Sequence, residues 1–189
     1  MKFLTFLNSG CLDICLNMLK SAENVGINMD DFIIACMDEE AYESLSSYKG
    51  AFLYMDQNLK EYQDWTFNSN SGFRNIVKHK WNIINQVHKE NPNLMWVDTD
   101  IVFKENPVEI LTGHEEVLFQ TDAPGSTICT GFMIFNETEQ CRKLVEECAS
   151  DDSADDQLIM NEIALTKYND YVALLSEDLF PNGNVYYQQ

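Results

Sequence analysis

Short apolar runs alternate with segments of helical periodicity along almost the whole chain, and this alternation limits the fold classes open to it. Apolar runs typical of strands cover residues 3–7, 31–37, 51–55, 94–97, 116–119, 131–135 and 171–175. Between them, apolar residues recur at helical spacing over residues 12–19, 38–45, 73–90, 138–148 and 156–165. Repeated strand–helix alternation predicts a three-layer α/β/α fold with a mainly parallel central sheet.

The chain shows no sign of division into several domains. Residues 57–72 are polar and irregular, which predicts a surface loop, and no repeat, low-complexity segment or linker is present. A length of 189 residues falls within the usual domain size of about 100–200 residues. We therefore expect one domain over residues 1–189, which is either complete or part of a larger protein, with truncation at the C-terminus one form of the latter.

The charge and cysteine content exclude several classes of protein. The chain has 31 Asp and Glu against 12 Lys and Arg, a net charge of -19, which disfavours nucleic acid and anionic membranes as partners. No apolar run approaches the roughly 18 residues that a membrane-spanning helix needs. The six cysteines form no CxxC pair, and several lie on apolar faces. They predict reduced core thiols and a cytoplasmic location.

Two aspartates follow the apolar run at residues 94–97. In an extended strand, Asp98 and Asp100 would point to one side while Thr99 points away. Paired carboxylates suit a hard divalent cation that completes its shell with water and substrate phosphates. Open α/β sheets also bind ligands beyond the carboxyl ends of their strands. The residues therefore predict either a metal-bridged diphosphate site or two solvated acids at a strand end.

Basic residues are concentrated around this pair of aspartates. They are Arg74, Lys78, Lys80, Lys89 and Lys104. This positive charge would either receive the phosphates of a ligand or form the ordinary solvated face of a helix.

The order of the motifs resembles the nucleotide-diphospho-sugar transferases of the GT-A fold, whose hallmark is a DxD after an apolar strand. Trp96-Val97-Asp98-Thr99-Asp100 resembles that central pattern, and residues 6–10 and 33–42 resemble the first two strands with their turns. The later matching segments are Phe119-Gln120-Thr121-Asp122, Thr130-Gly131-Phe132-Met133, Asp156-Gln157 with Asn161, and Phe180-Pro181-Asn182-Gly183. The resemblance covers nearly the whole chain and implies a Rossmann-like GT-A domain.

The resemblance also implies a reaction and a set of site residues. The chain would be a metal-dependent hexosyl- or pentosyltransferase that moves a sugar from a nucleoside-diphosphate sugar, with UDP as the default, to a hydroxyl of a glycan or glycoprotein. Asp98 and Asp100 would hold Mn²⁺ or Mg²⁺. Residues implied for the nucleotide and sugar are Thr5, Leu7, Asn8, Asp38, Lys80, Asp98, Thr99 and Gly131. The catalytic candidates are Asp156, Gln157 and Asp122.

Other interpretations stay open at this point. Residues 94–102 also fit the DxDx[TV] strand of a haloacid-dehalogenase-type phosphohydrolase, with Asp98 as nucleophile, although that fold normally starts with this strand. A non-catalytic acidic binding module is a second alternative. Asp156 would then only cap a helix, and Gly131 would only permit a tight turn. No histidine follows His114 to complete the family's metal site. Either phosphates and water complete it, or the missing ligand belongs to a larger protein.

Overall fold

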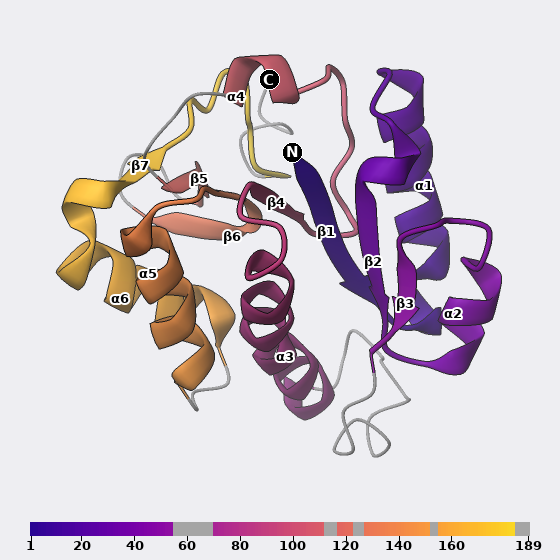
Figure 1. Ribbon diagram of the computed structural model, residues 1–189, viewed down its shortest axis with the longest axis horizontal. Helices are drawn as coiled ribbons and strands as arrows, with labels where there is room; N and C mark the ends of the chain where they lie inside the picture. The colour runs from indigo at the N-terminus through magenta and orange to yellow at the C-terminus, as the bar shows by residue number, and fades with distance from the viewer. Residues whose placement is uncertain (55–69, 112–116, 123–126, 152–154, 184–189) are drawn as a thin grey trace.

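The computed structural model describes residues 1–54, 70–111, 117–122, 127–151 and 155–183, without the side chains of residues 70–78. Within these residues, seven strands form one sheet in the order β3-β2-β1-β4-β6-β5-β7 (Figure 1). The strands are β1 (Lys2–Leu7), β2 (Phe32–Cys36), β3 (Ala51–Leu53), β4 (Leu94–Val97), β5 (Val117–Thr121), β6 (Ile128–Phe135) and β7 (Val172–Leu174).

The sheet is mainly parallel, as predicted. Strand β1 pairs in parallel with β2 and β4, β2 with β3, and β5 with β7. Only β6 runs antiparallel to its neighbours among the described strands, between β4 and β5. The carboxyl ends of β1, β2, β4 and β5 therefore lie at one edge of the sheet, together with the first residues of β6.

Helices cover both faces of the sheet, which confirms the three layers (Figure 1). Helices α3 (Asn70–His88), α5 (Glu139–Ser150) and α6 (Asp156–Lys167) pack on one face. Helices α1 (Leu12–Asn24), α2 (Glu39–Ser44) and α4 (Val108–Leu111) pack on the other. Three short 3-10 turns complete the described elements: η1 (Ser9–Cys11), η2 (Met29–Asp31) and η4 (Asn169–Tyr171).

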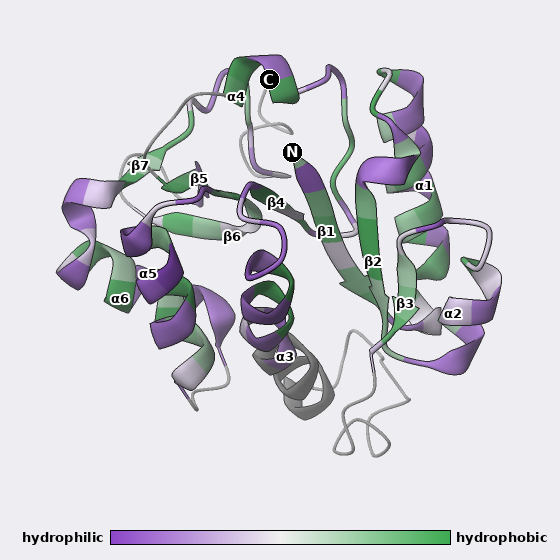
Figure 2. Cartoon of the chain, viewed as in Figure 1, coloured by the Kyte–Doolittle hydropathy of each residue, from purple (hydrophilic) through white to green (hydrophobic). Residues whose placement is uncertain are grey.

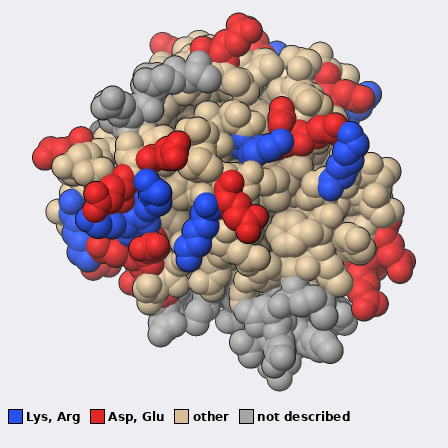
Figure 3. Space-filling view, in the orientation of Figure 1, with Lys and Arg blue, Asp and Glu red and all other residues tan. Residues whose placement is uncertain are grey.

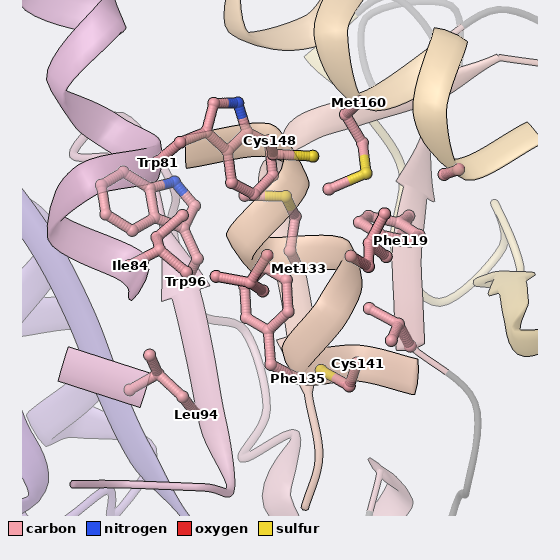
Figure 4. Packing of buried hydrophobic residues seen from close by; sticks show 14 of the residues in the cluster. Trp81, Ile84, Leu94, Trp96, Phe119, Met133, Phe135, Cys141, Cys148 and Met160 are labelled. Atoms are coloured by element: carbon pink, nitrogen blue, oxygen red, sulfur yellow. The ribbon is translucent and has the colours of Figure 1, made fainter. Parts of the chain in front are cut away.

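Each face of the sheet buries its own apolar cluster. Under α3, α5 and α6, Trp81, Trp96 and Phe119 pack together with the side chains shown in Figure 4. On the opposite face, Phe3 and Met18 pack in the cluster formed by β1, β2 and α1. The strands are accordingly mostly hydrophobic while the helices alternate between hydrophobic and hydrophilic residues (Figure 2). Removal of this apolar area from water is the main stabilising contribution to the fold.

The predicted elements are present, but several boundaries were wrong. Residues 70–72 belong to α3 and not to the predicted loop, whose residues 57–69 lie outside the described part of the chain. Strand β6 begins at Ile128, three residues before the predicted start. Helix α4 was not predicted. It is a single turn that follows Pro107, whose carbonyl accepts hydrogen bonds from the amides of Ile110 and Leu111.

The surface is acidic, with basic side chains interspersed among the acids of the visible face (Figure 3). Lys143 pairs with Glu139 at 2.7 Å and Lys167 with Glu147 at 2.6 Å, both on the outer side of α5 and α6. None of the described helices is long and apolar enough to cross a bilayer. All six cysteines are free, and all but Cys129 are buried.

Candidate active site

The candidate site lies at the sheet edge where the carboxyl ends of the parallel strands meet. Asn8 follows β1, Asp38 lies two residues after β2, Asp98 follows β4 and Asp122 follows β5. Helix α6 begins at the same edge, because Asp156 contacts the first residues of β6. Most of the predicted site residues are therefore brought to one end of the fold.

The two aspartates of the DxD motif lie in a turn and not in the strand. Strand β4 ends at Val97, and the amide of Ile101 donates to the carbonyl of Asp98 at 3.2 Å. The expectation that strand alternation aligns Asp98 and Asp100 was therefore wrong. The turn still keeps the two carboxylates close enough that the charge of Asp100 contributes to the raised pKa of Asp98. Asp100 is exposed, whereas Thr99 is half-buried.

Asp98 is held by one of its two carboxylate oxygens. Its Oδ1 accepts a hydrogen bond from Trp96 Nε1 at 2.8 Å and lies 3.2 Å from Lys80 Nζ. No described residue donates a hydrogen bond to Oδ2. Burial is the largest influence on the Asp98 carboxyl and raises its pKa, and Lys80 and Trp96 offset only part of this effect. A cation at Oδ2 would favour the charged form.

Lys80 is buried beneath the site. Its Nζ lies 2.6 Å from Asp156 Oδ2 and 3.3 Å from the carbonyl oxygen of Thr130, and it lies 5.3 Å from the ring centroid of Trp96. Burial alone would lower the Lys80 pKa, but Asp98 and Asp156 together raise it. Its ammonium group is enclosed by these partners, and its role toward the phosphates or sugar of a ligand stays a prediction.

The Asp156 side chain also contacts protein groups of the site. Besides Lys80, its carboxylate accepts a hydrogen bond from the Thr130 hydroxyl at 2.7 Å, and its carbonyl accepts one from Trp81 Nε1 at 3.2 Å. Burial raises the Asp156 pKa, but Lys80 and Thr130 outweigh it and lower the pKa overall. Asp156 is not the helix cap, because Asp155 accepts the capping bond from the amide of Leu158.

Gln157 is oriented at both ends of its amide. Its Nε2 donates to Asp122 Oδ2 at 3.1 Å, and its Oε1 accepts from the Thr130 amide at 3.4 Å. Asn161, one turn further along α6, donates to the Gln157 carbonyl at 2.8 Å. The predicted catalytic candidates Asp156, Gln157 and Asp122 are thus brought together around the start of β6.

An irregularity in β6 shapes this part of the site. The register with β5 shifts between Phe119 and Gln120, so that Phe119 faces Met133 while Gln120 faces Cys129. Residues 130–132 of β6 lie between these two pairs, and within them the Gly131 carbonyl accepts a hydrogen bond from the Asp98 amide at 2.8 Å. Bulges that shift the register of a strand pair are common beside active sites.

Gly131 allows this close approach and not a left-handed turn. Its backbone φ is not positive, and among the described residues only Gly26 has a positive φ. A Cβ at Gly131 would lie 3.3 Å from Asp98 Oδ2. The alternative of a glycine needed for a tight turn is therefore wrong, and the missing side chain leaves space beside the Asp98 carboxylate.

The residues predicted for the nucleoside pocket are mostly buried. Thr5 is fully buried, and Leu7 packs in the apolar cluster on α1. Thr5 Oγ1 and Asn8 Oδ1 are buried without a hydrogen-bond partner among the described residues. Asp38 accepts from the amides of Ser9 and Ala41, both at 2.8 Å, and so joins the ends of β1 and β2.

Sequence reasoning missed two further polar residues of this edge. Thr130 links Lys80 to Asp156, as described above. Asn182 Nδ2 donates to the Thr121 carbonyl at 2.7 Å and to the Asp122 carbonyl at 2.5 Å, which ties the turn after β7 to the end of β5. Asn182 was noted only as part of a matching turn, because partners 60 residues apart leave no local pattern.

Among the described residues, no group of three or more His, Cys, Asp and Glu is arranged to hold a metal ion. Asp98 and Asp100 therefore provide at most two protein carboxylates there.

Lys89 follows the end of α3, where His88 contacts the carbonyls of Pro92 and Asn136 at the opposite edge of the sheet. The expectation that Lys89 lies near the aspartates was wrong.

Comparison with known proteins decides the family. The sequence model of the nucleotide-diphospho-sugar transferases matches residues 27–187. The chain belongs to the nucleotide-diphospho-sugar transferase family. It is also similar to a UDP-galactose:fucoside alpha-3-galactosyltransferase of Dictyostelium discoideum, with 25% identity over 240 aligned residues. This similarity covers 98% of the chain but only 37% of the relative.

Solved structures place this member of the family in the GT-A fold. The galactosyltransferase LgtC in complex with donor and acceptor sugar analogs is similar at a TM-score of 0.61 and 10% identity, over 94% of this chain and 74% of that one. Mouse xyloside xylosyltransferase 1 is similar at a TM-score of 0.55 and 11% identity, over 93% and 85%. The haloacid-dehalogenase alternative is not favoured by these findings.

Proposed function

We propose that this transferase-family chain moves a sugar from a UDP-sugar to a hydroxyl group of a glycan or glycoprotein, with Mn²⁺ or Mg²⁺ bound by Asp98 and Asp100. The catalytic candidates remain Gln157, Asp122 and Asp156. The proposal rests above all on the division of the Asp98 carboxylate, in which Oδ1 contacts Lys80 and Trp96 and Oδ2 is left for a ligand.

That division fits a divalent cation. Lys80 and Trp96 engage Asp98 Oδ1, whereas no described donor engages Oδ2, and exposed Asp100 lies close to it in the same turn. Carboxylate oxygens are the ligands that Mg²⁺ and Mn²⁺ prefer, and such ions usually complete their shells with water and substrate phosphates. When bound, the ion would neutralise the diphosphate and favour its departure as the leaving group.

The chain's own residues would prepare this site for the donor. The buried Lys80 ammonium acts through Asp98 and Asp156, because it fixes both carboxylates and partly neutralises them. Gln157, held by Asp122 and the Thr130 amide, would place its amide beside the sugar where the glycosidic bond forms. Positioning of groups before the reaction lowers the entropic part of the barrier.

The similarity to a UDP-galactose-dependent enzyme supports UDP as the nucleotide and galactose as the first sugar to test. The chain spans about a third of that relative, so donor and acceptor are proposed from the shared part alone. The six free cysteines support the cytoplasm as the compartment, because thiols stay reduced there.

The proposal is tested by incubating the protein with UDP-galactose, UDP-glucose, UDP-xylose and GDP-mannose, each with and without Mn²⁺, and with fucosides and other glycosides as acceptors. We expect Mn²⁺-dependent release of UDP and a glycosylated product from at least one UDP-sugar. Asp100→Asn should abolish turnover, while Asp170→Asn, an exposed aspartate in η4, should leave it unchanged.

Two results would overturn the proposal. One is the absence of nucleoside-diphosphate release from every donor, together with no binding of UDP or GDP in the presence of Mn²⁺. The other is phosphomonoester hydrolysis that Asp98→Asn abolishes, since this would favour the phosphohydrolase.

A further inference from the structure

The side chain of Asn161 uses its whole amide to connect α6 with β6. Its Oδ1 accepts from the Ile128 amide at 2.8 Å, and its Nδ2 donates to the Ile128 carbonyl at 2.9 Å. The same Nδ2 donates to the Gln157 carbonyl at 2.8 Å. The amide therefore pairs with both backbone groups of the first residue of β6, in the way a neighbouring strand would.

The position of this contact matters because the site depends on how α6 meets β6. Gln157 lies in the first turn of α6, and its Oε1 accepts from the amide of Thr130, two residues after Ile128. Asp156 contacts Thr130 by a 2.7 Å hydrogen bond to its hydroxyl. Any sliding of α6 along β6 would break these contacts together, so the fit of helix to strand sets where the Gln157 amide lies.

We propose that Asn161 is a positioning residue, whose amide fixes the first turn of α6 to the first residue of β6 and thereby holds the Gln157 amide between Asp122 and Thr130. Asn161 has no described contact with Asp98, Asp100 or Lys80, so it acts through Gln157 and not on the donor. The catalytic part of this inference rests on the proposed sugar transfer. The structural part does not.

The structural part is tested by amide hydrogen exchange, measured by NMR, in Asn161→Ala. Exchange should become faster at Ile128, which loses its direct acceptor, and also at Thr130, whose acceptor Gln157 is released. We expect an increase of about tenfold or more at Thr130, which corresponds to one hydrogen bond. The amides of Met133 and Ile134, which lie within β6 between β4 and β5, should stay protected and report an intact sheet.

Two further variants separate positioning from packing. Asn161→Asp keeps the volume and the acceptor, but it places an oxygen opposite the carbonyls of Ile128 and Gln157, so it should not restore protection at Thr130. If Asn161→Ala does not fold, Asn161→Asp takes its place in the exchange measurement. Glu162→Ala, an exposed neighbour on α6, is the matched control and should match the wild type.

The catalytic part is tested by measuring kcat for sugar transfer and, separately, the Kd for UDP with Mn²⁺. In Asn161→Ala and Asn161→Asp, we expect kcat to fall about tenfold or more while the Kd for UDP with Mn²⁺ stays within about twofold. Unchanged exchange at Thr130, or full recovery by Asn161→Asp, would overturn the inference. So would a kcat equal to that of an active wild type. A wild type without transfer activity would refute the proposed function instead, and the exchange result would still decide the positioning role.

Discussion

Replacement of Lys80 by methionine removes the charge that two carboxylates share inside the site. The Lys80 side chain is only 4% exposed, and that of its closest partner Asp156 is 12% exposed. Removal of one member of a buried ion pair costs roughly 3–5 kcal/mol, because the other charge stays buried without compensation. The Asp98 side chain is 36% exposed, so solvent screens that contact and we count only the pair with Asp156. We therefore expect a loss of about 3 kcal/mol.

This loss is measured by urea unfolding at pH 7 and by calorimetry. For a domain of this size, about 3 kcal/mol corresponds to a decrease in Tm of roughly 6–12 °C. Lys143→Met is the control, because its pair with Glu139 is 59% and 71% exposed and its loss should leave stability unchanged. Adding Asp156→Asn to Lys80→Met should recover about 1 kcal/mol or more. Equal stabilities of Lys80→Met and Lys143→Met, or no recovery in the double variant, would refute the reasoning.

Two further predictions concern Asp98 Oδ2, the oxygen proposed to bind the metal, and His88 at the opposite edge of the sheet. Gly131→Ala places a Cβ 3.3 Å from Asp98 Oδ2, so it should weaken Mn²⁺-dependent UDP binding about tenfold, measured by calorimetric titration. Gly183→Ala is the control, because its Cβ meets nothing described within 4 Å and should leave the affinity unchanged. Equal affinities of the two variants would argue against the assigned oxygen. Burial lowers the pKa of His88, so the unfolded chain binds more protons below about pH 6.5, and stability should fall as the pH drops from about 7 to 5.5. His88→Gln should lose less stability over this interval, and an unchanged slope would contradict the assignment.

The layers of the fold could be predicted because each element carries a local pattern. The apolar run at residues 94–97 forms β4, pairs with β1 and β6, and is fully buried. The acids after β4 could be placed at a ligand-binding edge, since parallel strands end together. No local sequence pattern indicated the turn that contains Asp98 and Asp100. The two carboxylates are close because of this turn, and not because of the alternation of side chains along a strand.

The partners of the site residues were less predictable. Lys80 was predicted to serve the nucleotide and sugar, with a solvated helix face as the alternative, and its burial was not predicted. Ile84 and Val87 follow it at helical spacing and lie on the same buried side of α3. That spacing was a usable sign of its burial. Thr130 and Asn161 gave no such sign, because their partners lie up to 50 residues away and depend on how β6 and α6 meet.

In the proposed function, a metal ion joins Asp98 and Asp100 to a nucleoside diphosphate, and thermal unfolding with UDP tests this most directly. At about one hundred times Kd, a ligand stabilises the folded state by roughly 2.7 kcal/mol, so UDP with Mn²⁺ should raise the Tm of the wild type by about 5–10 °C. UDP without metal should raise it far less, and Asp100→Asn should lose the metal-dependent increase. Equal stabilisation by UDP with and without Mn²⁺, in both the wild type and Asp100→Asn, would contradict the account.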